Sequence, residues 1–184
     1  AWNKNVIALG LAGGFIEPLE STSIHLITTG VARLLKLFPF GGVTQPVVDH
    51  YNELSQYEIE RIRDFVCMHY HYNQRDDSPF WKECREMQIP ESLRERVELF
   101  RQGAHAYSKD GELFTVDSWI SVLMGQDIEP ETYHHFAKLD ERSLRDFLRK
   151  RHAKVAEVVN ALPHHPDFVR QYCGASPETW SLSK

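Results

Sequence analysis

The stretch Asn5–Leu26, NVIALGLAGGFIEPLESTSIHL, decides the fold of this chain. Residues 5–15 are apolar at nearly every position, which predicts a strand that is buried on both faces. Gly10, Gly13 and Gly14 interrupt this run, and a glycine inside a strand often marks a place where a ligand lies against the backbone. The stretch therefore predicts a glycine-containing strand that can approach a flat ligand.

A helix is predicted directly after this strand and its turn. Ser21 and Thr22 are good N-cap residues, and apolar residues then recur at helical spacing as far as Phe38. The first N–H groups of a helix lack partners within the helix, and the helix dipole adds positive potential there. The junction can therefore bind an anion, with Glu20 just outside it. A plain glycine-rich turn followed by a capped helix remains the alternative.

The rest of the chain has a mostly helical pattern. Apolar spacing and stop signals predict helices over 45–73, from Pro79, from Pro90 to about Gly103, over 118–124, over 141–162 and over 166–172. The predicted N-cap residues are Ser78, Asp117 and Asp140. The predicted fold class is therefore mainly α, with a short N-terminal β-strand followed by a helical domain.

Length, charge and cysteine content exclude several classes of protein. The 184 residues are enough for one domain with a sizeable core. A net charge of -5 gives no electrostatic reason to bind nucleic acid or an anionic membrane. The ten histidines show no metal-ligand spacing, so no metal site is predicted. The three cysteines form no CxxC motif and are interpreted as reduced thiols of a cytoplasmic protein.

Three motifs in this chain resemble those of the flavin-dependent tryptophan halogenases. The first is GFIEPLESTSIHLI at Gly14–Ile27, and the second is HYHYNQRDDSPFW at His69–Trp81. The third is DSWISVLMGQDIEP at Asp117–Pro130. Their order and spacing also agree with the family, so the resemblance extends over most of the chain.

The resemblance implies an oxidoreductase that uses reduced FAD, oxygen and a halide. In the family, the halide (chloride or bromide) is oxidised to hypohalous acid, which halogenates an indole or another electron-rich aromatic. The implied partners are a separate flavin reductase and the aromatic small molecule, with no nucleic acid and no membrane. The oligomeric state, monomer or homodimer, is left open.

The resemblance also implies roles for particular residues. Glu20 matches the glutamate that assists substitution at the aromatic ring. Thr22 and Ser23 match the two positions whose backbone holds the halide. The second position is usually glycine, so Ser23 suits the role only if a positive φ is not required there. The positions near the flavin ring match Leu11, Ala12 and Ile24.

The FAD-binding part of the family is not represented in this sequence. The chain contains no GxGxxG motif and none of its lysines lies in the family's lysine motif. Residues 1–20 are therefore interpreted as a terminal strand and turn of the flavin-binding module and its sheet. Residues 21–184 are interpreted as the helical, substrate-side domain. On this interpretation, the chain is the C-terminal portion of a longer enzyme and is inactive by itself.

Two other functions remain open at this point. The chain can be a helical lid or interaction domain of a related flavoprotein without halogenase activity, or part of a flavin monooxygenase. The segment 106–119 also lacks the aromatic and acidic cluster of family members that act on free tryptophan. The aromatic residues in it that can face a substrate are Tyr107, Phe114 and Trp119.

Overall fold

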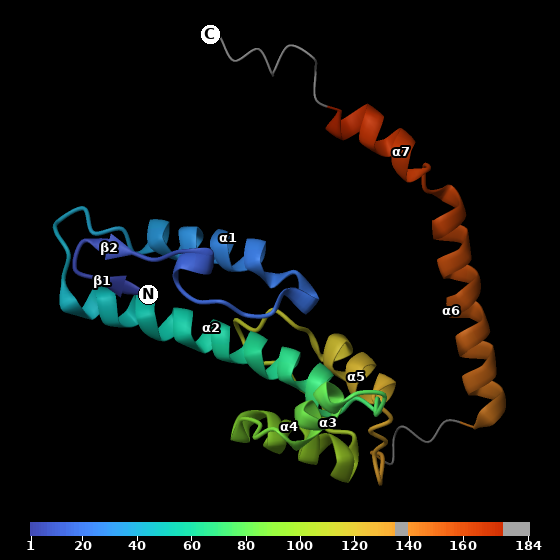
Figure 1. The fold of residues 1–184 in the computed structure, drawn as a ribbon. Coiled ribbons are helices and arrows are strands. Elements are labelled where there is room, and N and C mark those ends of the chain that lie inside the picture. Colours follow the sequence, from blue (N-terminus) through green and yellow to red (C-terminus); the bar gives the residue numbers. More distant parts are fainter. Residues whose placement is uncertain (135–139, 175–184) are drawn as a thin grey trace. The chain divides into compact units, whose positions relative to one another are not determined.

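The computed structural model describes residues 1–134 and 140–174 (Figure 1). The chain forms two compact units, residues 1–134 and residues 135–184. The fold is mainly helical, as predicted, and its described strands are confined to one short hairpin. None of the described helices is long and apolar enough to cross a membrane.

The N-terminal segment forms a hairpin instead of the long strand predicted over residues 5–15. Strands β1 (Trp2–Asn3) and β2 (Val6–Ile7) pair antiparallel, and the chain then enters the 3₁₀ helix η1 (Gly10–Ala12). Gly10 has a φ of 53°, which ends extended structure there. Ile27 packs so closely over Gly10 that an added Cβ would lie 2.4 Å from Cγ1 of Ile27. The predicted strand is therefore wrong beyond Ile7.

Helices α1 (Thr22–Lys36) and α2 (Gln45–His71) lie side by side in the first unit (Figure 1). They approach closely at Gly30, whose carbonyl accepts a hydrogen bond from the buried Tyr51 hydroxyl at 3.3 Å. The hairpin packs against α2 at the same residue, Tyr51. Trp2 lies edge-to-face on the Tyr51 ring, with ring centroids 5.6 Å apart. Asn52 bonds both backbone groups of Trp2, at 2.6 and 2.9 Å.

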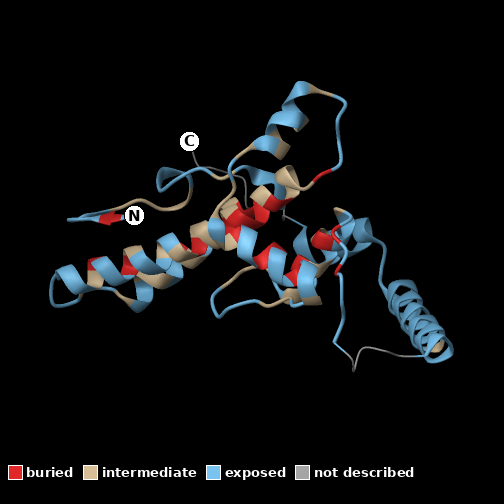
Figure 2. Ribbon diagram, turned by 90° about the horizontal axis from the view of Figure 1, so that it is seen from below, coloured by how far each residue is buried: buried red, intermediate tan, exposed pale blue. Residues whose placement is uncertain are grey.

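The larger hydrophobic core lies where the second half of α2 meets the following helices. These are α3 (Pro79–Glu86), α4 (Glu91–Gly103) and α5 (Val116–Gly125). Figure 2 shows buried residues along α2, α4 and α5. The core side chains are Phe65, Met68, Leu93, Val97, Phe100, Trp119, Leu123 and Ile128. Burying each such side chain stabilises the fold by about 1.5–3 kcal/mol.

The predicted caps differ in outcome. Asp140 caps its helix as predicted, since its Oδ1 accepts a hydrogen bond from Ser143 N at 3.0 Å. Asp117 does not cap α5, because that helix begins at Val116 and the hydroxyl of Thr115 accepts the bond from Ser118 N at 3.4 Å. Ser78 precedes α3 as predicted, but its side chain makes no capping hydrogen bond.

The second unit consists of helical segments. Helix α6 (Glu141–Ala161) is followed by α7 (His165–Phe168) and a π-helical turn, η4 (Val169–Cys173). Three basic residues of α6 pair with acidic neighbours on the same helix: Arg145, Arg149 and Lys154. This pairing is typical of a solvated helix face. The division at residues 20 and 21 stays a prediction, and residues 135–139 and 175–184 of the predicted second domain lie outside the described residues.

Candidate active site

Glu20 lies at the end of a short 3₁₀ turn that leads directly into α1. This turn, η2 (Pro18–Glu20), is followed by Ser21 in the left-handed conformation, and α1 then begins. The carboxylate of Glu20 reaches α2, where its Oε1 lies 3.1 Å from Nε2 of His69. The side chain of Glu20 is 33% exposed and that of His69 is 17% exposed. The side chain of Glu20 is therefore accessible to solvent, while one of its oxygens contacts α2.

Glu17, the second carboxylate of the motif, belongs to the turn itself. Its Oε2 accepts a hydrogen bond from Leu19 N at 3.0 Å and so caps η2. Burial raises the pKa of Tyr70, and the hydrogen bond to Glu17 raises it further. Glu17 therefore holds the turn. The two carboxylates therefore have different environments. The Glu17 carboxylate bonds the backbone of the turn, whereas the Glu20 carboxylate contacts His69 on α2.

The N-terminus of α1 has no side-chain cap. Ser21 is the N-cap residue, but with φ at 55° its side chain makes no capping hydrogen bond. The next residue, Thr22, is buried, with 2% of its surface exposed. Ser23 lies within the helix and is not among the residues with positive φ. A serine at this position is therefore unstrained, and the left-handed conformation is at Ser21.

The three residues that match the flavin positions lie on an apolar, exposed surface. Leu11 and Ala12 are in η1, which contacts α1, and Ile24 is in the first turn of α1. Leu11 is 62% exposed and Ile24 is 76% exposed. Exposed apolar residues continue along α1 at Ile27, Val31 and Leu35, and Phe38 follows the end of the helix. Apolar patches of this kind mark surfaces that bind a ligand or another part of a protein.

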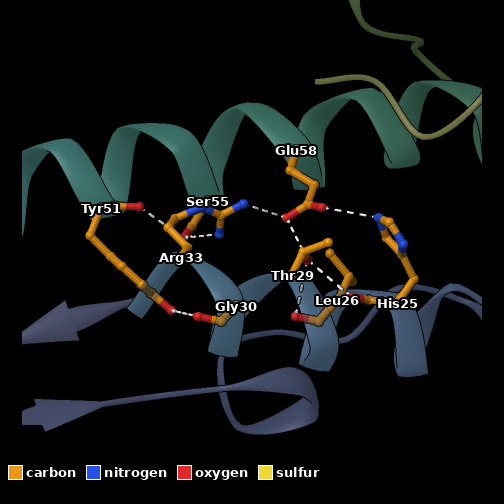
Figure 3. A network of polar contacts seen from close by, with 8 residues as sticks. All are labelled: His25, Leu26, Thr29, Gly30, Arg33, Tyr51, Ser55 and Glu58. Atoms are coloured by element: carbon orange, nitrogen blue, oxygen red, sulfur yellow. Dashed lines mark hydrogen bonds and ion pairs between the residues drawn. The ribbon is translucent and has the colours of Figure 1, made fainter. Parts of the chain in front are cut away.

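A buried polar network holds α1 against α2 beneath this surface (Figure 3). Glu58 of α2 is its centre and is 7% exposed. Its two oxygens contact Nε2 of His25 at 3.1 Å, the Thr29 hydroxyl at 3.1 Å and Nη2 of Arg33 at 2.7 Å. These three partners are four residues apart on α1 and so share one face of that helix. The network fixes both the rotation and the axial position of α1.

Of the three aromatic residues that can face a substrate, one is buried in the core and two are partly buried. Trp119 is 2% exposed and belongs to the larger core. Phe114 stacks on Phe65 with ring centroids 3.7 Å apart, and the guanidinium of Arg96 lies over the ring of Tyr107. The burial of Trp119 leaves it no exposed face for a substrate. Among the described residues, no three histidine, cysteine or acidic side chains form a group that could hold a metal ion.

His69 is the site residue that was not predicted. The second motif begins at His69, but the resemblance assigns this residue no role. The available signal was its position four residues after Phe65 on an apolar helix face, which directs the ring inward. The contact with Glu20 joins segments that are distant in sequence, and no periodic pattern reports such a contact.

The sequence profile of a family described as tryptophan halogenase matches residues 1–141. The chain therefore belongs to the tryptophan halogenase family. Among curated relatives, the tryptophan 6-halogenase ThaL of Streptomyces albogriseolus is 36% identical over 103 residues, which cover 56% of this chain and 19% of ThaL. The chain thus spans about a fifth of the length of this relative.

Solved structures give a longer match. Xcc4156, a flavin-dependent halogenase from Xanthomonas campestris, is 45% identical, with a TM-score of 0.89, and the match covers 95% of this chain and 36% of Xcc4156. BrvH, a flavin-dependent halogenase from Brevundimonas sp. BAL3, is 38% identical, with a TM-score of 0.84, over 93% of this chain and 35% of BrvH. The similarity therefore extends into the second unit, while most of each relative lies outside the match.

Proposed function

We propose that this chain is the helical, substrate-side portion of a flavin-dependent halogenase that acts on an indole or another electron-rich aromatic. The observation that carries the proposal is the junction of η2 and α1, where a partly exposed carboxylate directly precedes an uncapped helix N-terminus. Both the solved and the curated relatives named above are halogenases, which supports this function over a lid domain without halogenase activity.

Glu20 is proposed as the catalytic carboxylate. When a halogen adds to an aromatic ring carbon, the ring becomes cationic and must lose a proton from that carbon. A carboxylate beside the ring stabilises the cation and accepts the proton, so that the electrons of the C–H bond restore aromaticity. One oxygen of Glu20 contacts His69, and the exposed part of the side chain is accessible to a substrate.

The halide is proposed to bind at the backbone N–H groups of Thr22 and Ser23. Uncapped N–H groups and the helix dipole attract an anion at this end of a helix. The helical φ of Ser23 lets its N–H point along the axis as the other first-turn groups do. A serine therefore fits a position where the contact is made by backbone.

The flavin ring is proposed to lie on the exposed apolar surface at Leu11, Ala12 and Ile24. An exposed apolar patch next to an anion-binding helix end suits a flat aromatic cofactor. When bound, reduced FAD and oxygen supply the oxidising equivalents that convert the halide to hypohalous acid. The nucleotide part of FAD is proposed to bind residues outside this chain, in a module to which residues 1–20 also belong.

The complete enzyme is further proposed to be cytoplasmic and to receive reduced FAD from a separate reductase. The 184-residue chain is not expected to halogenate by itself, because the described residues offer surfaces for the ring and the anion but no phosphate-binding loop. Both statements apply the family's organisation to this chain and depend on the activity proposed above.

The proposal is tested by exchanging Glu20 for glutamine in the full-length protein. We expect Glu20→Gln to lower halogenated product by about 10²–10⁴-fold, since glutamine cannot accept the proton. Oxidation of reduced flavin, followed by its absorbance, should continue at nearly the parent rate. Glu17→Gln is the matched control, because an amide oxygen still accepts the bond from Leu19 N. Parent-level halogenation by Glu20→Gln, or a hydroxylated product formed without halide, would contradict the proposal.

A further inference from the structure

The hydrogen bond of Nδ1 of His69 defines which nitrogen of the neutral ring carries a proton. Its Nδ1 lies 2.8 Å from the backbone carbonyl oxygen of Phe65, one helical turn earlier. A carbonyl oxygen only accepts hydrogen bonds, so Nδ1 must be the donor. A neutral imidazole has one N–H, and in His69 that N–H is therefore at Nδ1. In the neutral ring, Nε2 would present a lone pair.

That lone pair would face another acceptor. Nε2 of His69 lies 3.1 Å from Oε1 of Glu20, and an ionised carboxylate also only accepts. Two lone pairs this close repel each other, so the contact favours a proton on one of the two facing atoms. The pair of Glu20 and His69 therefore holds one proton more than a neutral imidazole and a carboxylate hold together.

The shared proton belongs mainly to the imidazole. In water an imidazole is a stronger base than a carboxylate, and both side chains of this pair are partly exposed to water. The resulting form is an imidazolium that donates from Nδ1 to the Phe65 carbonyl and forms an ion pair through Nε2 with Glu20.

The imidazole ring is itself fixed by the core. It packs edge-to-face on Phe65, with ring centroids 5.0 Å apart. Phe65 in turn stacks on Phe114 at 3.7 Å and packs edge-to-face on Trp119 at 4.9 Å. The packing of the core therefore sets the orientation of His69, and the contact with His69 in turn orients Glu20.

We propose that His69 is a positioning residue for Glu20: as an imidazolium it holds one oxygen of Glu20, which leaves the other oxygen to act on the substrate ring. This inference rests on the proposed function of Glu20. During substitution, the free oxygen of Glu20 takes the ring proton, and the electrons of the C–H bond return to the ring. His69 keeps its own proton and touches neither the substrate nor the cofactor.

The protonation state is tested first, on the 184-residue chain labelled with ¹⁵N at histidine. At pH 7, the signal that disappears in His69→Gln should have both ring nitrogens protonated. In Glu20→Gln the same ring should become neutral, with the proton at Nδ1. A parent ring that is neutral at pH 7, or a ring unchanged by Glu20→Gln, would overturn the inference independently of any activity.

The positioning role is tested in the full-length enzyme with three variants. His69→Phe keeps an aromatic ring on Phe65 but has no donor, whereas His69→Gln supplies a neutral donor. We expect His69→Phe to lower kcat for halogenation by up to about a hundred-fold, as expected for a displaced catalytic group. His69→Gln should recover part of this loss, with KM little changed in both. His50→Gln, an exposed histidine on the same helix, is the control.

The outcomes separate this inference from the proposed function. If the parent enzyme halogenates, Glu20→Gln is inactive and His69→Phe retains the parent kcat, then His69 has no positioning role and Glu20 keeps its own. If Glu20→Gln halogenates at the parent rate, the proposed function of Glu20 fails while the imidazolium signal still reports the pair.

Discussion

Arg33 of α1 and Glu58 of α2 form a largely buried ion pair, with Nη2 2.7 Å from Oε2. The guanidinium also donates to the Ser55 hydroxyl at 2.8 Å, so both of its terminal nitrogens are bonded to α2. Together with the contacts of Glu58 to His25 and Thr29, this pair joins the two helices over more than two helical turns. It therefore determines where the N-terminus of α1, and with it the proposed halide site, lies.

Loss of the Glu58 carboxylate should destabilise the fold strongly. We expect Glu58→Ala to lower the free energy of unfolding by about 3–5 kcal/mol, because Arg33 stays buried without a counter-charge. Urea denaturation of the chain measures this change. Glu53→Ala on the same helix is the matched control: its side chain is 80% exposed, and surface substitutions of this kind stay within about 0.5 kcal/mol. Equal effects of the two substitutions would contradict the structural role of Glu58.

Bromide should bind at Thr22 and Ser23 only in the complete, FAD-bound protein. The uncapped N–H groups attract an anion, but water competes with it at an open helix end. Cover by a cofactor lowers the local dielectric constant and strengthens the attraction. Crystals soaked in bromide, measured for anomalous scattering, should therefore show a peak in the holoenzyme and none in the 184-residue chain. A peak in the chain alone would show that the helix end suffices, and no peak in either would remove the halide role.

The cap of α6 should depend on pH. Asp140 accepts hydrogen bonds from the side chain and from the backbone of Ser143. These bonds, the side-chain bond most of all, hold the pKa of Asp140 below its ordinary value of 3.8. A lowered pKa in the folded state means that the cap contributes stability above the ordinary pKa and loses it as the pH falls through the folded pKa. The amide proton shift of Ser143 should titrate with a midpoint below 3.8.

Asp140→Asn is the matched control for this titration. Asparagine accepts the same capping bond but carries no titratable group, so the Ser143 signal should keep its capped position at low pH. A midpoint at or above 3.8 in the parent chain would show that the carboxylate is not held in this bond.

Cys67 should react slowly with alkylating reagents. Burial raises the pKa of the Cys67 thiol, and Asp64 adds to the shift while Arg63 opposes it. A raised pKa leaves less thiolate at a given pH, and the thiolate is the nucleophile. Mass spectrometry after iodoacetamide treatment at pH 8 should show Cys173, which is exposed, modified before Cys67. In urea, both cysteines should react at similar rates; faster labelling of Cys67 in the folded chain would contradict the expectation.

The sequence predicted local structure better than contacts between segments. The helix predicted over 45–73 is observed at Gln45–His71, since apolar spacing and flanking stop signals are local properties. The strand predicted over 5–15 failed because an apolar run shows burial but not the presence of a pairing strand, and two glycines there have positive φ. The roles of Glu20, Thr22 and Ser23 came from the resemblance of one continuous motif, and they stay predictions.

The contacts that organise the site could not be predicted from the sequence. The ion pair of Arg33 with Glu58 and the contact of Glu20 with His69 each join two separate elements. Neither contact is visible in the apolar pattern of the sequence. A single polar residue on the buried side of a helix looks the same in this pattern as a polar residue at the edge of the buried face. Only the folded arrangement of η2 and α1 against α2 shows that these side chains meet.

The close approach of Ile27 to Gly10 has a consequence for how this family can vary. A methyl group at position 10 would overlap the Ile27 side chain, and the φ of 53° at Gly10 disfavours any residue with a Cβ. A substitution at position 10 therefore becomes tolerable only after residue 27 has become smaller. The two positions should accordingly covary across related chains, with the change at 27 arising first in any lineage that loses the glycine.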